Sequence, residues 1–326
     1  MATVRGTNAA PAGRKRIGST PALSTSDTSP SSQTLLTHIR SLLPSLAPAE
    51  QRVGAAAVAD PAGIAAKTIS QLAELCDTSE TTVVRFCRAI GVRGYPELRI
   101  ALASAAGRAD NEGRPNGVGS DIGPDDTLDD ILAKVGFADA HAVEDTVGQL
   151  DTRVLTAVID AVVSARRVEL YGVGASAFVA MDLQQKLHRI GRLVFAWADP
   201  HTALTSAALL GSGDVAIGFS HTGETTDTIV SLAEANRRGA TTLAITNYPR
   251  STITASADYV LTTAARETTF RSGAMASRIA ALTVVDCIFV GVAQRNFADT
   301  LRALELTHDA VAAVHHRNAR NGGRGR

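Results

Sequence analysis

Two kinds of hydrophobic spacing divide the chain. Between residues 33 and 106 apolar side chains recur at helical intervals in short segments, which prolines and glycines interrupt. This pattern predicts a compact all-α domain. Beyond residue 164, short runs rich in β-branched and aromatic residues alternate with helical stretches, which predicts βαβ crossovers.

The alternating half predicts an α/β domain with a doubly wound, parallel, five-stranded sheet. Two helices, about Thr127–Leu150 and Thr152–Ser164, precede it. We expect strands at Val168–Tyr171, Leu193–Ala196, Val215–Phe219, Thr242–Ile245 and Tyr259–Leu261, and intervening helices at Ala177–Arg189, Thr225–Arg238 and Ala276–Val292.

Composition sets the remaining boundaries. Residues 107–124 hold five glycines and two prolines in 18 positions, which predicts a flexible linker. Residues 1–32 are rich in Ser, Thr, Pro and Ala, and predict a disordered arm. The α/β domain then spans 125–310, and residues 311–326 are expected to form a disordered basic tail.

Charge and cysteine content exclude several classes of protein. The 32 Lys and Arg balance 32 Asp and Glu, so any affinity for DNA must come from a local surface. Cys76, Cys87 and Cys287 show no metal-ligand spacing, and we expect them to be reduced core residues. No signal-peptide pattern and no apolar run of membrane-spanning length is present, so we expect a cytoplasmic protein. Because no metal-ligand pattern is found either, we expect neither a metal nor another cofactor.

The segment Thr68–Gly91 predicts two short helices joined by a tight turn. Thr68 followed by Gln71 matches a capping box at the start of the first helix, and Ser79 can cap the second. Asp77 occupies the turn, where a residue that tolerates the left-handed region is needed.

The second of these helices has two distinct faces. Val83, Phe86, Cys87 and Ile90 recur at i, i+3, i+4 and i+7 and are expected to be buried, which leaves Thr81, Arg85 and Arg88 outside. A recognition helix needs such a face, because hydroxyl and basic side chains contact bases and phosphates. A purely structural helix pair would show the same spacing.

Two strand-to-helix turns of the α/β domain carry small and hydroxyl residues. Gly172, Gly174 and Ser176 follow the first strand, and the run from Ser220 to Thr225 (SHTGET) follows the third. Backbone amides and hydroxyls at helix N-termini suit a phosphate. A dinucleotide site is the competing interpretation of the glycines, but the second strand lacks the terminal acidic residue that would bind ribose.

These motifs together resemble a known family. The segment from Leu46 to Leu102 is similar to the N-terminal domain of RpiR/MurR-type regulators, and the α/β half resembles the sugar isomerase (SIS) domain that accompanies it. The family's SxxTVxRFCRxLGxxGxxELR motif is matched by Ser79, Thr82, Val83, Arg85, Phe86, Cys87, Arg88, Gly91, Gly94, Glu97, Leu98 and Arg99. Its phosphate loop S-x-[ST]-G-x-[ST] is matched by Ser220, Thr222, Gly223 and Thr225, with His221 in place of a common Gln.

The resemblance implies a DNA-binding transcriptional regulator, not an enzyme, that acts as a homodimer or higher oligomer. A sugar phosphate is the implied effector, and genes of carbohydrate metabolism are the implied targets. The alternative is an aldose-ketose phosphosugar isomerase, with Glu267 and His188 as acid–base candidates. Expected DNA contacts are Thr68, Ser79, Thr81, Thr82, Arg85 and Arg88; expected phosphosugar contacts are Gly174, Ser176, Ser220, Thr222, Gly223, Thr225 and Glu267.

Overall fold

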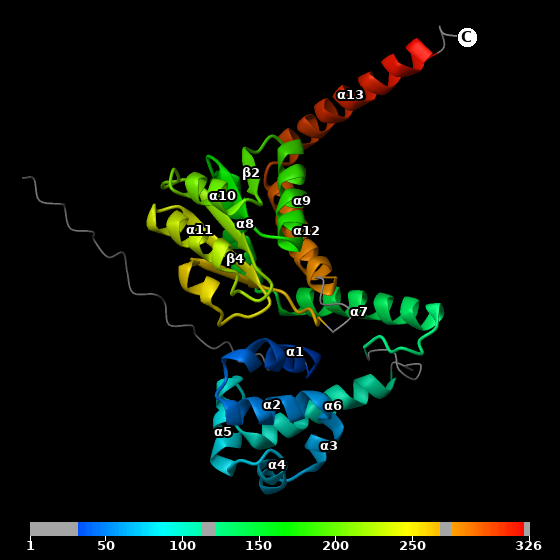
Figure 1. Ribbon diagram of the computed structural model, residues 1–326, viewed down its shortest axis with the longest axis vertical. Helices are drawn as coiled ribbons and strands as arrows, with labels where there is room; N and C mark the ends of the chain where they lie inside the picture. The colour runs from blue at the N-terminus through cyan, green and yellow to red at the C-terminus, as the bar shows by residue number, and fades with distance from the viewer. Residues whose placement is uncertain (1–31, 112–120, 268–274, 323–326) are drawn as a thin grey trace, which may run out of the picture. The chain divides into compact units, whose positions relative to one another are not determined.

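The computed structural model describes residues 32–111, 121–267 and 275–322 (Figure 1). Almost all of the predicted arm 1–32, and residues 112–120 of the predicted linker, lie outside these ranges. An all-α domain and an α/β domain are described below, each by itself.

The all-α domain is a cluster of short helices around one apolar core. Phe86, Leu72 and Leu98 are among its fully buried side chains. Its last helix continues to Asn111, five residues past the predicted boundary, because extending an existing helix fixes only one residue for each new hydrogen bond. The helices are α1 Ser32–Leu42, α2 Pro48–Ala59, α3 Pro61–Ala66, α4 Ile69–Leu75, α5 Glu80–Ala89 and α6 Tyr95–Asn111, with a 3-10 turn, η1, at Leu43–Ser45.

The α/β domain contains the predicted five-stranded parallel sheet. Its strand order is β2-β1-β3-β4-β5, so the chain winds outward in both directions from the middle of the sheet. Every residue of β1 and β3 is buried, as expected for central strands covered on both faces. The strands are β1 Val168–Tyr171, β2 Val194–Trp197, β3 Val215–Phe219, β4 Thr241–Thr246 and β5 Tyr259–Thr262.

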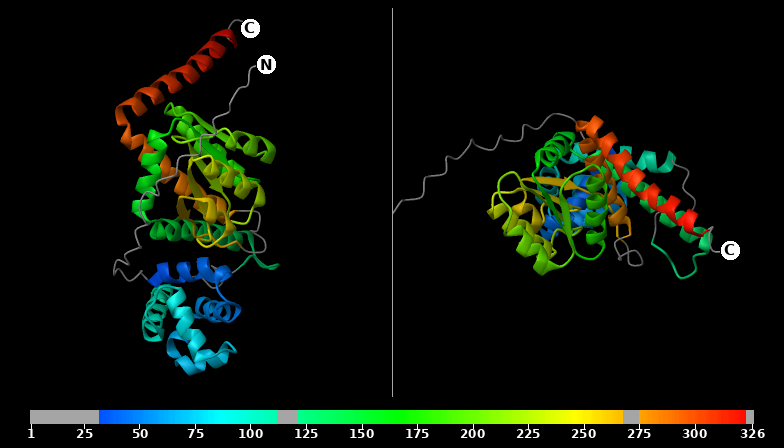
Figure 2. Two further views of the ribbon diagram at one scale, coloured as in Figure 1. Left: turned by 90° about the vertical axis from the view of Figure 1, so that its left-hand side faces the viewer. Right: turned by 90° about the horizontal axis from the view of Figure 1, so that it is seen from above.

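Helices cover both faces of the sheet (Figures 1 and 2). Side chains of α8, α9 and α12 form the core on one face, and α10 with α11 packs on the other. The long helix α7 packs against α12. The bounds are α7 Leu128–Gln149, α8 Thr152–Ser164, α9 Ala175–Arg189, α10 Pro200–Ala207, α11 Thr226–Arg237, α12 Ala276–Arg295 and α13 Phe297–Gly322, with a 3-10 turn, η2, at Thr252–Ser256.

Helix α12 is strongly apolar, with Arg278 and Asp286 as charged residues before its last turn. By length and composition it could cross a membrane, and it is the one such helix among the described residues. Val284, Val285 and Ile288 are nevertheless completely buried in the core beside the sheet. A helix buried between α7, α8 and α9 has this composition without any contact with lipid.

Two helices differ from the sequence-based expectation. Helix α10 was not predicted, and its eight residues begin at Pro200 with Asp199 as the N-cap. The tail expected to be disordered from residue 311 is helical to Gly322, as the continuation of α13. Alanine and leucine dominate the first two-thirds of α13, and their high helix propensity outweighs the polar composition of the end.

Candidate functional site

The turn between α4 and α5 fixes the orientation of the helix with the exposed arginines. Asp77 has a φ of +45°, which confirms the left-handed conformation expected in this turn. Arg52 of α2 donates from Nε to the Cys76 carbonyl at 2.8 Å and from Nη2 to the Asp77 carbonyl at 2.6 Å. Its guanidinium therefore satisfies carbonyls that the end of α4 leaves without helical partners. Sequence reasoning missed Arg52, because 24 residues separate it from the turn.

Two of the predicted DNA-contacting hydroxyls, those of Thr68 and Ser79, also cap these helices. The Thr68 hydroxyl accepts from the Gln71 amide at 3.2 Å, and Gln71 returns the bond, which confirms the capping box. Ser79 accepts from the amide of Thr82, whose side chain is mostly buried. These residues hold the helices in place, and direct contact between them and DNA stays a prediction.

The exposed residues of α5 are Glu80, Thr81, Arg85 and Arg88, whereas Val83 and Phe86 are completely buried. The Nε and Nη2 atoms of Arg85 lie 3.0 and 2.9 Å from Oε1 of Glu50 on α2. This pair orients the guanidinium while more than half of the Arg85 side chain remains in solvent. Helix α5 therefore presents a positioned basic face.

In the α/β domain, a pocket opens where strands β3 and β4 end and where helices α9 and α12 begin. Ligands of doubly wound sheets bind at these carboxyl ends. Of the predicted residues, Ser176 and Ser220 line it directly. The full lining consists of Ala175, Ser176, Val179, Phe219, Ser220, His221, Ile245, Thr246, Thr263, Ser277, Arg278 and Ala281.

The loop between β3 and α11 is folded around the Ser220 hydroxyl. Ser220 Oγ accepts from the Gly223 amide at 3.0 Å and lies 2.9 Å from Oγ1 of Thr225. Thr222 Oγ1 accepts from the Glu224 amide at 3.1 Å. The loop thus brings the predicted hydroxyls together at the N-terminal end of α11.

Glycine is structurally required at two points beside the pocket. Gly223 has a φ of +71°, and a Cβ atom there would lie 1.9 Å from the Ser251 hydroxyl. Gly174 has a φ of +59° directly before α9 begins. Both positions favour glycine because larger residues rarely adopt this conformation. The backbone can therefore turn sharply into the helices on both sides of the pocket.

The start of α12 forms a third side of the pocket. Glu267 Oε1 accepts from the Ser277 amide at 2.7 Å, which stabilises the N-terminal turn of α12. Arg278 lines the pocket and is exposed. The structure therefore gives Glu267 a role in holding the helix, and its predicted ligand contact stays a prediction. Arg271, in the same segment of the sequence, lies outside the described residues.

Among the described residues, three buried polar atoms near this pocket have no hydrogen-bond partner: His221 Nδ1, Glu267 Oε2 and Ser277 Oγ. Burial lowers the pKa of His221, and the nearby Glu267 charge acts in the opposite direction. His221 also meets the ring of Tyr248 edge-on at 5.8 Å. Unpaired buried polar groups are costly, so these atoms favour a ligand that offers several hydrogen-bonding groups.

Metal-binding clusters of His, Cys, Asp or Glu are absent from the described part of the chain. The three cysteines are free; Cys76 and Cys87 are buried, and Cys287 is partly buried. Buried Cys76 and Cys87 agree with the core role expected from the sequence. The side chains that line the pocket supply hydroxyls, one imidazole and one guanidinium, and the Glu267 carboxylate is bonded to the amide of the lining residue Ser277.

Family comparisons match both halves of the chain. The model of the rpiR-family helix-turn-helix domain matches residues 33–108, and the SIS domain model matches residues 162–291. An HTH-type transcriptional regulator of Caldanaerobacter subterraneus is 35% identical over 278 residues, which covers 85% of this chain and 97% of the relative. One from Haemophilus influenzae is 35% identical over 260 residues, covering 80% and 90%.

Solved structures give the same assignment of folds. The Vibrio vulnificus NanR protein, complexed with ManNAc-6P, aligns over 86% of this chain and 98% of its own with a TM-score of 0.54 and 26% identity. The sugar isomerase domain of an RpiR transcription factor from Sphaerobacter thermophilus covers 55% of this chain and 98% of its own, with a TM-score of 0.51 and 27% identity. The helical and α/β domains thus occur together in proteins of known architecture.

Proposed function

The chain belongs to the rpiR family of helix-turn-helix transcriptional regulators, and from this premise we propose that a sugar phosphate in its SIS pocket modulates operator binding. The target genes would be those of carbohydrate metabolism. The observation that supports this proposal most strongly is the pocket itself, where a hydroxyl-lined loop at a helix N-terminus lies beside three unpartnered polar atoms.

For the operator, the proposal assigns base and phosphate contacts to the exposed face of α5. Thr81 lies in its first turn, where the side chains of a recognition helix reach base edges. Arg85 and Arg88 then contact phosphates or guanine, and the pair with Glu50 keeps Arg85 oriented. Thr68, Ser79 and Thr82 contribute through the helix caps and through phosphate contacts near the helix ends.

For the effector, the proposal places the phosphate against the β3–α11 loop. The hydroxyls of Ser176, Ser220, Thr222 and Thr225 and the amides near Gly174 and Gly223 donate hydrogen bonds, and the N-terminal ends of α9 and α11 supply partial positive charge. His221, Glu267 and Ser277 then bind the hydroxyl groups of the sugar. The similar NanR protein was solved with a phosphorylated amino sugar, which supports this ligand class.

Helix α7 is the proposed route from the pocket to the reading domain. Thr146 of α7 is completely buried, and its hydroxyl accepts from the Ala264 amide at 3.0 Å. The same segment continues to Glu267, which caps α12. Ala142 of α7 packs in a cluster with Ala265, Ala276 and Ala280, so a ligand that shifts the start of α12 also acts on α7.

The proposal includes a homodimer or larger assembly, because a two-fold protein reads a palindromic operator. It places this assembly in the cytoplasm.

A role other than catalysis is supported by the position of His188. As a partner for Glu267 in an isomerase it would have to reach the sugar, but it is exposed in the last turn of α9, whereas the pocket is lined by the first turn. The isomerase alternative thereby loses His188, the acid–base partner that the sequence suggested for Glu267.

A pair of variants tests the proposal. Arg85→Ala is expected to weaken binding to DNA from the gene's own upstream region at least ten-fold, and to leave thermal stabilisation by sugar phosphates unchanged. Ser220→Ala with Thr222→Ala is expected to abolish that stabilisation and leave ligand-free DNA binding intact. Turnover of a sugar phosphate by the wild-type protein, without any specific DNA complex, would instead establish an isomerase.

A further inference from the structure

Arg278 is a charged side chain of the pocket that neither the phosphate nor the sugar hydroxyls require. It lies in the first turn of α12, lines the pocket and is exposed. It forms no hydrogen bond and no ion pair with another described residue. Among the residues that line the pocket it is the one permanently charged side chain.

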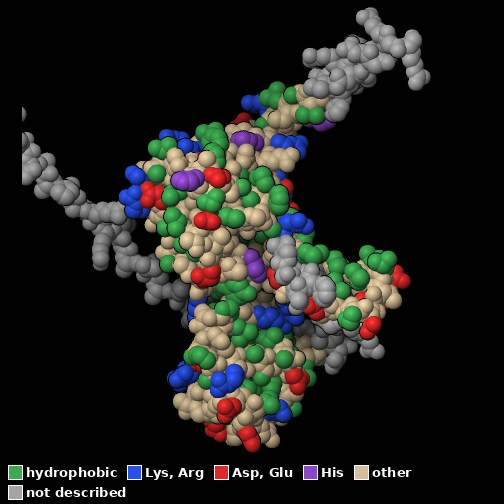
Figure 3. Space-filling model, viewed as in Figure 1, with side chains coloured by type: hydrophobic (Ala, Val, Ile, Leu, Met, Phe, Trp, Pro, Cys, Tyr) green, Lys and Arg blue, Asp and Glu red, His purple; other side chains and the backbone are tan. Residues whose placement is uncertain are grey.

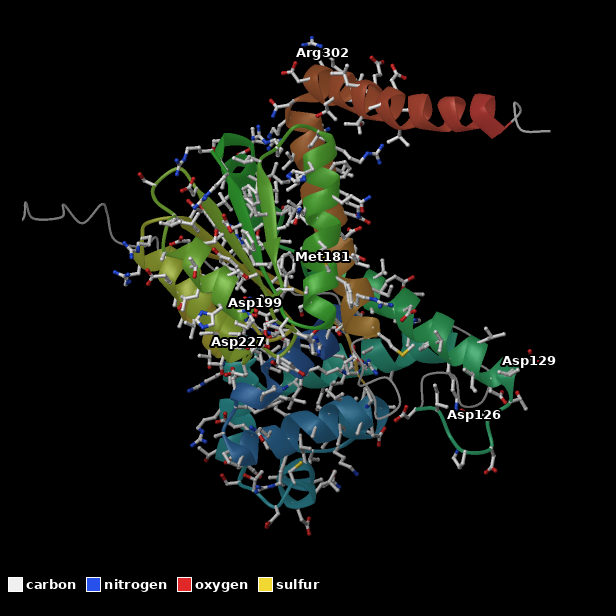
Figure 4. The ribbon with its side chains drawn as sticks, turned by 45° about the horizontal axis from the view of Figure 1, so that its top comes forward. Asp126, Asp129, Met181, Asp199, Asp227 and Arg302 are labelled. Atoms are coloured by element: carbon white, nitrogen blue, oxygen red, sulfur yellow. The ribbon has the colours of Figure 1, made fainter. Side chains whose placement is uncertain are left out.

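The place of Arg278 on its helix is unfavourable for a cation. The N-terminal end of a helix carries partial positive charge, so acidic side chains stabilise it. Figure 4 labels Asp129, Asp199 and Asp227, which stand at the starts of α7, α10 and α11. The first turn of α12 contains no acidic residue and carries Arg278 instead. Its guanidinium therefore adds to the positive potential of the helix end.

Two polar groups beside Arg278 also lack partners among the described residues. Ser277 is buried, and its hydroxyl oxygen is unpaired. Glu267 accepts from the Ser277 amide through Oε1, whereas its Oε2 atom is buried and unpaired. The Glu267 carboxylate and the Arg278 guanidinium form no ion pair with each other, so each can bind a separate group of a ligand.

The groups on α12 form a different wall of the pocket from the phosphate loop. Ser220 and His221 follow strand β3, and Ser176 lies at the start of α9, whereas Ser277 and Arg278 come from the start of α12. Hydroxyls and backbone amides at a helix N-terminus bind a phosphate without the help of a cation. A phosphate held by the Ser220 loop leaves the α12 wall to the other end of the ligand.

The charge of the surface gives no general attraction for anions. Lys and Arg side chains are scattered among acidic ones on the face of the α/β domain that Figure 3 shows, and the chain as a whole is balanced. Selection of an anion must therefore come from groups inside the pocket.

We propose that Arg278 selects effectors with a second anionic group, a carboxylate or a second phosphate, at the end of the sugar remote from the phosphate in the Ser220 loop. The planar guanidinium binds this group through paired N–H donors. Glu267 and Ser277 bind sugar hydroxyls beside it. The inference rests on the proposed function and narrows its ligands from sugar phosphates to sugar-acid phosphates and sugar bisphosphates.

The test compares two pairs of ligands that differ at the end remote from a shared phosphate. Glucose 6-phosphate is paired with gluconate 6-phosphate, and fructose 6-phosphate with fructose 1,6-bisphosphate. Isothermal titration calorimetry of the full-length protein gives the dissociation constants. In at least one pair the doubly acidic member is expected to bind at least about ten-fold more tightly, because a charge-assisted pair is stronger than a neutral hydrogen bond. The first pair tests a carboxylate and the second a phosphate.

Arg278→Gln is expected to remove this preference and to leave the affinity for the singly acidic member unchanged. The unchanged affinity also shows that the variant retains its fold. Arg189→Gln is the matched control and is expected to keep the preference. It removes the same charge, but Arg189 is exposed in the last turn of α9, whereas the pocket is lined by the first turn.

Equal affinities within both pairs would overturn the inference, as would a preference that survives in Arg278→Gln or is lost equally in Arg189→Gln. An equal loss for both members of a pair in Arg278→Gln would place the guanidinium on the shared phosphate and would also overturn it. In each of these cases sugar phosphates still bind, so the proposed regulation stands. If no sugar phosphate bound the wild-type protein, the proposed effector function would fail together with this inference.

Discussion

At the scale of single residues, the phosphate loop depends on a glycine that no other residue can replace without strain. Gly223→Ala would place a Cβ atom 1.9 Å from the Ser251 hydroxyl at a φ of +71°. We expect a loss of about 1–3 kcal/mol of folding stability and loss of sugar-phosphate binding. Differential scanning fluorimetry with and without a panel of sugar phosphates measures both.

Gly136 supplies the control for this substitution. It lies within α7, and a Cβ atom there would contact nothing within 4 Å among the described residues. Gly136→Ala is therefore expected to raise stability by about 0.5–1 kcal/mol and leave ligand binding unchanged. If the two alanine variants behaved alike, the assignment of a special role to the Gly223 loop would be contradicted.

His221 predicts a pH dependence whose sign follows from its burial. Its pKa is lowered in the folded protein, so the unfolded chain binds the proton more readily. The contribution of neutral His221 to folding stability is fully present above the unfolded pKa of about 6.5. It is lost as the pH falls toward the folded pKa, by about 1.4 kcal/mol for each unit by which folding lowers the pKa. His221→Gln should flatten this part of the stability curve.

Chemical denaturation at pH 5, 6, 7 and 8 checks this prediction. The wild type is expected to lose stability relative to His221→Gln as the pH drops from 7 to 5. Subtracting the two curves removes the contribution of His38, whose pKa is also lowered by burial. A constant difference across the range would show that His221 is not the buried, neutral group described above.

At the scale of elements, the helix-turn-helix turn depends on Arg52. Arg52→Ala removes both donors to the carbonyls at the end of α4 and leaves the left-handed turn at Asp77 without support. We expect a loss of about 1–3 kcal/mol of stability and weaker operator binding even though Arg52 is not placed on the reading face. Thermal denaturation and fluorescence anisotropy with operator DNA are the measurements.

Substitutions of Asp77 test the same turn in both directions, because one is expected to stabilise it and the other to destabilise it. Asp77→Gly places the residue best suited to a φ of +45° there and is expected to stabilise the domain by up to about 1 kcal/mol. Asp77→Val is expected to destabilise it. An order reversed between these two variants would be incompatible with the turn geometry.

Helix α7 makes a prediction about communication between the domains. Thr146→Val keeps the shape of the side chain but removes the acceptor for the Ala264 amide. Effector affinity is expected to fall only a few-fold, whereas the effect of the sugar phosphate on operator affinity should largely disappear. A variant with normal coupling would exclude α7 as the route.

Sequence patterns predicted the elements well where their periodicity was strong. The strands β1 and β3 have the predicted bounds, and the buried face of α5 is the predicted one, because central strands and amphipathic helices leave clear hydrophobic signatures. Helix α10 has eight residues and begins with Pro-His-Thr, too short for a periodic signal. The helical end of α13 was missed because its composition resembles a solvated tail.

The site was only partly predictable for a related reason. Ser176 and Ser220 follow strands directly, so the sheet topology alone brings them together. Ser277 and Arg52 act through tertiary contacts across many residues of sequence, which no local pattern encodes. The buried Glu169 on β1, paired with the Trp197 indole, is another polar group that only the packed sheet explains.

At the scale of the whole molecule, effector binding in the α/β domain is proposed to change the free energy of operator binding by the all-α domain. An effector can change operator affinity only if it binds the DNA-competent and DNA-incompetent states with different affinities. A coupling of about 1–3 kcal/mol corresponds to a change of roughly 5–150-fold in operator affinity. The same factor must appear as a change in effector affinity when the operator is bound.

The most direct test is a titration of fluorescent operator DNA with the full-length protein, repeated with saturating members of a sugar-phosphate panel and with their unphosphorylated sugars. At least one phosphorylated sugar is predicted to change the operator dissociation constant five-fold or more in the wild type. The unphosphorylated sugars should have no effect, and the Ser220→Ala, Thr222→Ala variant should not respond. Tight operator binding that no phosphorylated sugar alters, or a response that survives in this variant, would contradict the account.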